Sequence, residues 1–68
     1  MLTTKQHELY TYITAHIREH GVAPTHDEMA NAMGLASKSG VTRMLNGMEK
    51  RGYIRRMRGL RQAIEVLK

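Results

Sequence analysis

The hydrophobic residues near the start of the chain recur at the spacing of an α-helix. Leu9, Ile13 and Ile17 follow one another every four positions and therefore share one helical face. Thr3 and Gln6 stand at the spacing of an N-terminal capping box, in which each side chain bonds the other residue's backbone amide. The pattern predicts a first helix that begins after Thr3 and continues to about residue 20, where a glycine follows.

A second capping box, Thr25 with Glu28, predicts the start of a shorter helix. Its buried side is expected to consist of Met29, Ala32 and Met33, and the glycine at position 34 is placed to end it. Only a short turn then separates this helix from Ser37, a favourable cap for a third helix. Helices joined by so short a turn cross steeply, so the sequence predicts a helix-turn-helix.

The third helix, predicted over residues 37–51, has two chemically distinct faces. Its apolar stripe, at the spacing of a face that packs on a core, comprises Val41, Met44, Leu45 and Met48. The opposite face contains no acidic residue and consists of Ser39, Thr42, Arg43, Asn46 and Lys50. A face of cationic and hydrogen-bonding groups indicates contact with an anionic partner.

Two glycines, Gly40 and Gly47, lie on the flank of that apolar stripe. Each costs roughly 1 kcal/mol of helix propensity relative to alanine. We therefore expect another backbone to come close at both positions.

After Gly52 the pattern changes from helical to extended. Residues 53–57 and 63–67 are short β-prone runs, and the positively charged residues between them suit the tip of a hairpin. The predicted order is three helices followed by a C-terminal β-hairpin, which is an α+β and mostly helical fold. Residues 1–68 are expected to form a single small domain.

The charge distribution identifies the kind of partner more clearly than the net charge of +5 does. Residues 1–35 contain two basic and four acidic side chains, a net −2, whereas residues 36–68 contain nine basic and two acidic ones, a net +7. This asymmetry favours a polyanion, and nucleic acid ahead of an anionic membrane, because the basic part is not one long amphipathic helix. The alternative is a basic surface that serves solubility.

Other classes of site find little support in the sequence. The chain has no cysteine and no apolar run of the length that a membrane span requires, which fits a cytoplasmic protein. His16 and His20 are one helical turn apart, but no third metal ligand accompanies them. No nucleophile, base and orienting acid can be assembled, so we expect neither an enzyme nor a bound metal or cofactor.

At this point the chain resembles the amino-terminal DNA-binding domain of LexA-type repressors, a winged helix-turn-helix. The similar stretches are LTTKQHELYTYI, GVAPTHDEMANAMGL, the serine-capped helix that ends in KRGYI, and the closing IEVL. The resemblance implies that residues 37–51 are the recognition helix in the major groove and that residues 53–67 are the wing. It also implies DNA contacts from Ser37, Ser39, Gly40, Thr42 and Arg43.

This sequence also departs from the family at the DNA-facing positions. Members often have a proline after the capping serine, then an asparagine and acidic residues along the exposed side, where this chain has Lys38, Ser39, Thr42 and Arg43. The base preference of the family therefore does not transfer. The longer members also carry a self-cleaving Ser-Lys protease domain with the main dimer contacts, which the resemblance does not reach.

The leading hypothesis is sequence-specific binding of double-stranded DNA by a transcriptional regulator of repressor type. Thr42 and Arg43 are expected to read base edges with help from Ser39 and Asn46. Phosphate contacts are expected from the start of the third helix, its end and the wing, namely from Ser37, Lys38, Lys50, Arg56, Arg58 and Arg61. The alternative is an adaptor that uses the same scaffold to bind an acidic protein. In isolation we expect a monomer, with pairing on a palindromic operator.

Overall fold

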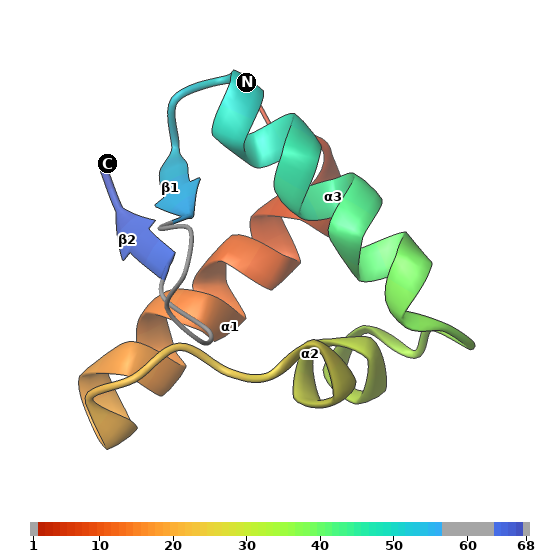
Figure 1. The fold of residues 1–68 in the computed structure, drawn as a ribbon, viewed down its shortest axis with the longest axis horizontal. Helices are drawn as coiled ribbons and strands as arrows, with labels where there is room; N and C mark the ends of the chain where they lie inside the picture. Colours follow the sequence, from red (N-terminus) through yellow and green to blue (C-terminus); the bar gives the residue numbers. More distant parts are fainter. Residues whose placement is uncertain (1, 57–63, 68) are drawn as a thin grey trace.

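The computed structural model describes residues 2–56 and 64–67 of the chain. It contains three helices and two strands: α1 (Thr4–His20), α2 (His26–Met33), α3 (Lys38–Lys50), β1 (Ile54–Arg56) and β2 (Ile64–Val66). The two strands pair antiparallel, and the predicted order of elements is confirmed. Figure 1 shows the helices arranged around a common centre, with the strands beside α1 and below the end of α3. The fold is a winged helix with a C-terminal hairpin.

Both predicted capping boxes are formed. The Thr3 hydroxyl accepts a hydrogen bond from the Gln6 amide at 3.1 Å, and Gln6 Oε1 accepts one from the Thr3 amide at 3.1 Å. At α2 the Glu28 amide donates to the Thr25 hydroxyl at 3.0 Å, and the Thr25 amide donates to Glu28 Oε1 at 2.8 Å. These bonds satisfy amides that have no partner within the helix, so local sequence alone determines where α1 and α2 begin.

The connection between α2 and α3 is a tight turn that begins at a left-handed glycine. Gly34 has φ 68°, and the amide of Leu35 donates to the Ala30 carbonyl at 2.8 Å. α3 then begins at Lys38, with Ser37 in the cap position. In Figure 1, α2 is seen nearly end-on while α3 runs across the view, which is the steep crossing of a helix-turn-helix.

A small core holds the helices and β1 together. Its buried side chains come from all three helices and from the first strand: Leu9, Ile13, Met29, Ala30, Val41, Leu45, Met48 and Ile54. The prediction for α2 was wrong at one position, because Ala32 is exposed and Ala30 is buried in its place. Positions 29, 30 and 33 also share one side of a helix, and the way α2 packs on its neighbours decides which set is covered.

The register of the hairpin determines the side on which each wing residue lies. Ile54 pairs with Val66, Arg55 with Glu65, and Arg56 with Ile64. Because alternate residues of a strand face opposite sides, Arg56 shares the side of the buried Ile54, whereas Arg55 and Glu65 share the outer side. The tip of the hairpin lies outside the described residues.

The two glycines of α3 accommodate side chains, so the expectation of a nearby backbone was wrong. A Cβ built on Gly40 would lie 3.2 Å from Cδ1 of Leu35, in the turn before the helix. A Cβ on Gly47 would lie 2.6 Å from Nε2 of Gln6, near the start of α1. Both glycines therefore let a neighbouring side chain lie against the surface of α3.

Candidate nucleic-acid interface

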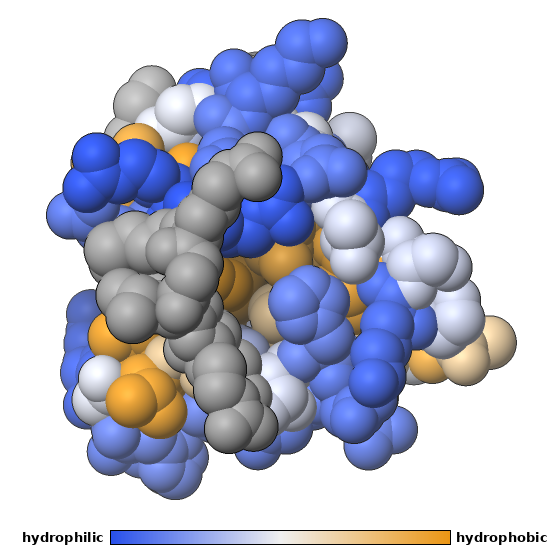
Figure 2. Space-filling model, in the orientation of Figure 1, coloured by the Kyte–Doolittle hydropathy of each residue, from blue (hydrophilic) through white to orange (hydrophobic). Residues whose placement is uncertain are grey.

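The polar face of α3 is exposed along its whole length. Val41, Leu45 and Met48 are fully buried beneath it. The residues at the surface are Lys38, Ser39, Thr42, Arg43, Asn46 and Lys50. In Figure 2 hydrophilic residues cover the visible side of α3, and apolar residues appear in the middle of the view, between the elements. The helix thus presents a continuous polar surface that is supported from behind by the core.

Three residues at the centre and end of this face are free to contact a partner. The side chains of Thr42, Arg43 and Lys50 make no hydrogen bond or ion pair with other residues in 2–56 or 64–67. The Arg43 guanidinium has five donors, and because none of them is used within the described residues, they are available to an acceptor on a partner. The structure therefore brings the predicted base-reading pair, Thr42 and Arg43, to the surface together.

The start of α3 differs from the starts of the other two helices. Ser37 stands at the cap position with an extended backbone, but its side chain makes no capping hydrogen bond. Its hydroxyl instead lies 2.8 Å from the hydroxyl of Ser39. Ser37 is therefore not the side-chain cap that the sequence indicates, and within residues 2–56 and 64–67 no side chain caps the first amides of α3. Uncapped amides at the positive end of a helix suit an anionic oxygen.

Lys38, at the first position of α3, reaches back to α2. Its ammonium lies 3.4 Å from a carboxylate oxygen of Asp27, and both side chains are well exposed. An exposed pair of this kind is worth no more than about 1 kcal/mol, because water and salt screen it. Lys38 can exchange Asp27 for a phosphate at little cost.

Arg56, a predicted phosphate contact, is engaged within the protein. Its Nε and Nη2 donate to Oε1 of Glu49 at 3.1 and 2.9 Å, and its backbone amide donates to Oε2 of the same residue at 3.1 Å. Nη2 also donates to Oδ1 of Asn46. About two-thirds of each of the Arg56 and Glu49 side chains is covered. The two side chains and Asn46 join the wing to the exposed face of α3.

The other cations of the wing fall into two groups. Arg55 pairs with Glu65 across the hairpin, with Nη2 and Oε1 2.5 Å apart on its outer side. Arg58 and Arg61, both predicted to contact DNA, lie outside the described residues.

Gly40, another residue predicted to contact DNA, lies in the first turn of α3 and is half-buried beside Leu35.

Two residues that support this surface were not identified from the sequence. Glu49 holds Arg56, and Gln6 accepts a hydrogen bond from Arg51 Nη1 at 3.2 Å just beyond α3. Helical spacing predicts neither contact. Between Glu49 and Arg56 the helix ends and the turn at Gly52 intervenes, and Gln6 and Arg51 are separated by most of the chain. The opposite charges of Glu49 and Arg56 are the one available hint.

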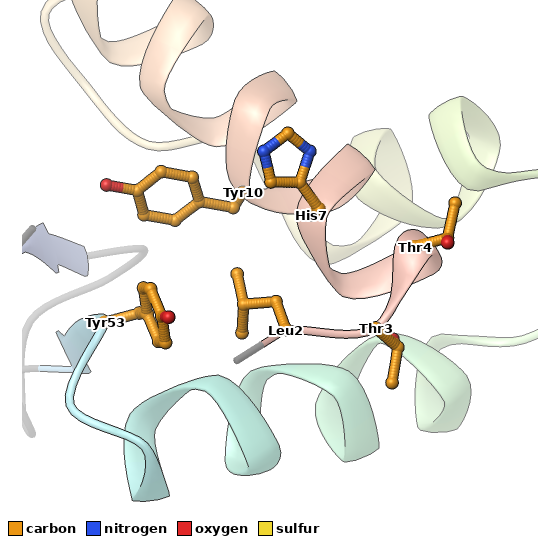
Figure 3. Close-up of a pocket in the computed structure, with 6 residues that line it drawn as sticks. All are labelled: Leu2, Thr3, Thr4, His7, Tyr10 and Tyr53. Carbon is orange, nitrogen blue, oxygen red and sulfur yellow. The ribbon is translucent and has the colours of Figure 1, made fainter.

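A separate hollow of about 460 Å³ lies between the start of α1 and the residue before β1. Figure 3 shows Leu2 and the rings of Tyr10 and Tyr53 turned toward one another on one side of it, with His7 and Thr4 nearer the start of α1. The two tyrosine rings meet edge to face with centroids 5.9 Å apart. Among the described residues of this lining, His7 is the one acid–base side chain besides the tyrosines.

His16 and His20, in the second half of α1, make contacts within the fold. A ring nitrogen of His16, Nδ1, lies 2.8 Å from the Val22 carbonyl oxygen, and Nε2 lies 3.8 Å from Oε1 of Glu28. The His20 ring lies beside it at a tilt of 44°, with ring centroids 4.5 Å apart. Within residues 2–56 and 64–67 no group of three or more histidine, aspartate and glutamate side chains could hold a metal ion.

Comparison with known proteins agrees with this geometry. The family model described as the LexA DNA binding domain matches residues 1–63. The chain belongs to the LexA DNA-binding domain family. It is thus a LexA-like regulator whose winged helix-turn-helix binds DNA, and the family is a DNA-binding rather than a catalytic one. In the described part of this LexA-family domain no helix is both long and apolar enough to span a bilayer.

Proposed function

We propose that this domain binds double-stranded DNA sequence-specifically and represses transcription, with α3 as the recognition helix in the major groove. The observation that carries the proposal is the exposed face of α3, on which Thr42 and Arg43 lack partners within the described residues while the opposite stripe is fully buried. A helix fits the major groove, where each base pair presents a distinct pattern of donors and acceptors.

Arg43 is the principal reader in this proposal. It lies in the second turn of α3, and its planar fork matches the two acceptors, O6 and N7, that guanine presents in the major groove. Thr42 stands beside it and can donate to or accept from a base, or contact a thymine methyl group. Ser39 and Asn46 lie one turn before and after this pair and extend the reading surface.

Phosphate contacts on either side position the helix. Ser37 and Lys38, with the uncapped amides at the start of α3 and Gly40, meet one strand, and Lys50 at the other end meets the second. Arg58 and Arg61 of the wing extend to the backbone or to the adjacent minor groove. These contacts supply affinity and orientation, and base-edge contacts supply the discrimination.

The binding unit is one domain per half-site. Alone the domain is a monomer, and two copies on a palindrome place their half-site centres about 34–36 Å apart, or a multiple of that distance. Sedimentation of the free protein and of its complex measures both states. A tight dimer in the absence of DNA would contradict this arrangement.

A protein-binding adaptor is less well supported. Such an adaptor is expected to expose an apolar patch at its contact face. Within the described part of the chain the large apolar residues that are exposed are Val22 and Leu67, and neither lies on α3. The chemistry of the α3 surface favours the polyanion.

Selection from random duplexes tests the proposal. One enriched motif is expected for the wild-type domain. Arg43→Ala should cost about 1–3 kcal/mol on the selected duplex and relax preference at one position. Lys50→Ala, the matched loss of a cation from the same helix, should weaken selected and scrambled duplexes alike. The proposal fails if no motif is enriched, or if Arg43→Ala lowers affinity equally for both duplexes.

A further inference from the structure

A hydrogen bond between the wing and α3 determines which way the amide of Asn46 faces. Arg56 Nη2 lies against the amide end of Asn46. A guanidinium has only donors, so the Asn46 atom that meets it must be the oxygen, Oδ1. The NH2 group of the same planar amide therefore lies on the side away from Arg56. This assignment follows from the chemistry of the two groups.

The arginine that orients Asn46 is itself held in place. Glu49 accepts from its Nε and Nη2 through Oε1 and from its backbone amide through Oε2, so both carboxylate oxygens of Glu49 act on one residue. The hairpin register keeps Arg56 on the side of Ile54, facing α3. The Arg56 guanidinium is thus held by Glu49, and its backbone by Glu49 and the hairpin, in the absence of DNA.

We propose that Arg56 and Glu49 are positioning residues that make Asn46 a donor-only reader of base edges. The inference rests on the proposed function of α3 as a recognition helix. Asparagine usually pairs with adenine by accepting from N6 and donating to N7 at once. In this domain Oδ1 already accepts from Arg56, and the positive charge of that guanidinium disfavours a second donor such as adenine N6, so Asn46 acts through the donation from its NH2 group. Asn46 therefore favours guanine and thymine. Their major-groove edges offer acceptors and, unlike adenine, present no donor that would need an acceptor from the protein.

The proposal gives Arg56 a role different from a phosphate contact. A phosphate-binding arginine adds affinity to every duplex, whereas one that orients Asn46 changes the preference at a single base pair. The two roles therefore separate in a base-preference measurement. A merely structural role for Arg56 would leave the preference unchanged in molecules that remain folded.

Selection from random duplexes with five variants tests the proposal. Asn46→Ala identifies the position that Asn46 reads, as the one where preference is lost. At this position the wild type should favour guanine or thymine over adenine by about fivefold, the worth of one hydrogen bond. Arg56→Met, which removes every side-chain donor, should free Oδ1 and shift this position toward adenine. Arg56→Lys retains a donor for Oδ1 and should retain the wild-type preference.

The matched control is Arg55→Met, on the neighbouring residue whose partner, Glu65, lies on the outer side of the hairpin. It should leave that position unchanged. Since Arg56→Met leaves Glu49 without this partner, the double variant Glu49→Met with Arg56→Met provides a second test in which both charges of this pair are removed together. It should show the same shift toward adenine, with circular dichroism confirming the fold.

Each result has a distinct meaning. If the wild type enriches no motif, the proposed function fails. If a motif is enriched but Asn46→Ala alters no position, or the wild type prefers adenine there, the inference is overturned while the proposed function stands. The inference is also overturned if both Arg56→Met and the double variant keep the wild-type base.

Discussion

The side chain of Gln6 lies directly against Gly47, where a Cβ would come within 2.6 Å of its Nε2. The same side chain accepts from the Thr3 amide and from Arg51 Nη1 through Oε1, at 3.1 and 3.2 Å. Gln6 therefore joins the cap of α1 to the end of the recognition helix. The missing side chain at position 47 makes room for this contact.

Gly47→Ala should therefore have two opposing effects on the free energy of unfolding of the wild-type protein. Alanine gains about 1 kcal/mol of helix propensity, and displacing the Gln6 amide loses hydrogen bonds of similar total worth. The net change in the free energy of unfolding should be close to zero. In a Gln6→Ala background the same substitution should stabilise by about 1 kcal/mol. Urea unfolding of the four proteins measures the coupling, and equal effects in both backgrounds would exclude it.

Two leucines provide a matched test of the core. Leu45 is fully buried between α3 and its neighbours, whereas Leu67 is 49% exposed. Leu45→Ala should lower the free energy of unfolding by about 2–5 kcal/mol, because it leaves a cavity. Leu67→Ala should change it by no more than about 0.5 kcal/mol. Similar losses at both positions in denaturant unfolding would show that the core is not where the structure places it.

DNA affinity should fall steeply with salt. Each neutralised phosphate contributes a slope of about −0.9 in log affinity against log salt, so engagement of Lys38, Lys50, Arg58 and Arg61 gives roughly −3 to −4. Lys38→Ala should flatten the slope by about one unit. Arg55→Ala, which removes a cation already paired with Glu65, is the comparison and should flatten it less. A slope near zero for the wild type would remove the electrostatic contribution to binding.

Stability should respond to acid through Glu28. The pKa of Glu28 is lowered below its ordinary value, mainly because the backbone amide of Thr25 donates a hydrogen bond to the Glu28 carboxylate. Partial desolvation raises this pKa, whereas the Thr25 hydroxyl and the nearby His16 and His20 lower it further. A lowered pKa in the folded state means that the stabilisation is present above the ordinary glutamate pKa. It is lost as pH falls through the folded value.

Glu28→Gln isolates this contribution. The glutamine oxygen can still accept from the Thr25 amide, but it does not titrate. Melting temperatures measured from pH 7 down to pH 3 should therefore fall less for Glu28→Gln than for the wild type. Identical acid dependence in the two proteins would show that Glu28 is not the group responsible.

Local sequence alone determined the ends of α1 and α2 and the face of α3 that is exposed. Thr3, Thr25 and the glycines at positions 21 and 34 act on backbone groups within a few residues, so their effect does not depend on the rest of the fold. The stripe beginning at Val41 is set by helical periodicity, which is also local. For these reasons the positions of Thr42 and Arg43 at the surface could be predicted.

Only the tertiary structure decided how distant groups pair on that surface. From the sequence, Arg56 cannot be distinguished from the other cations of the wing. The register of β1 and β2 directs its side chain toward Glu49 and Asn46. The contact of Gln6 with Gly47 likewise requires α1 to pack against α3. Such contacts depend on the relative placement of whole elements, which no local spacing encodes, because side chains far apart in the chain meet only after the core has formed.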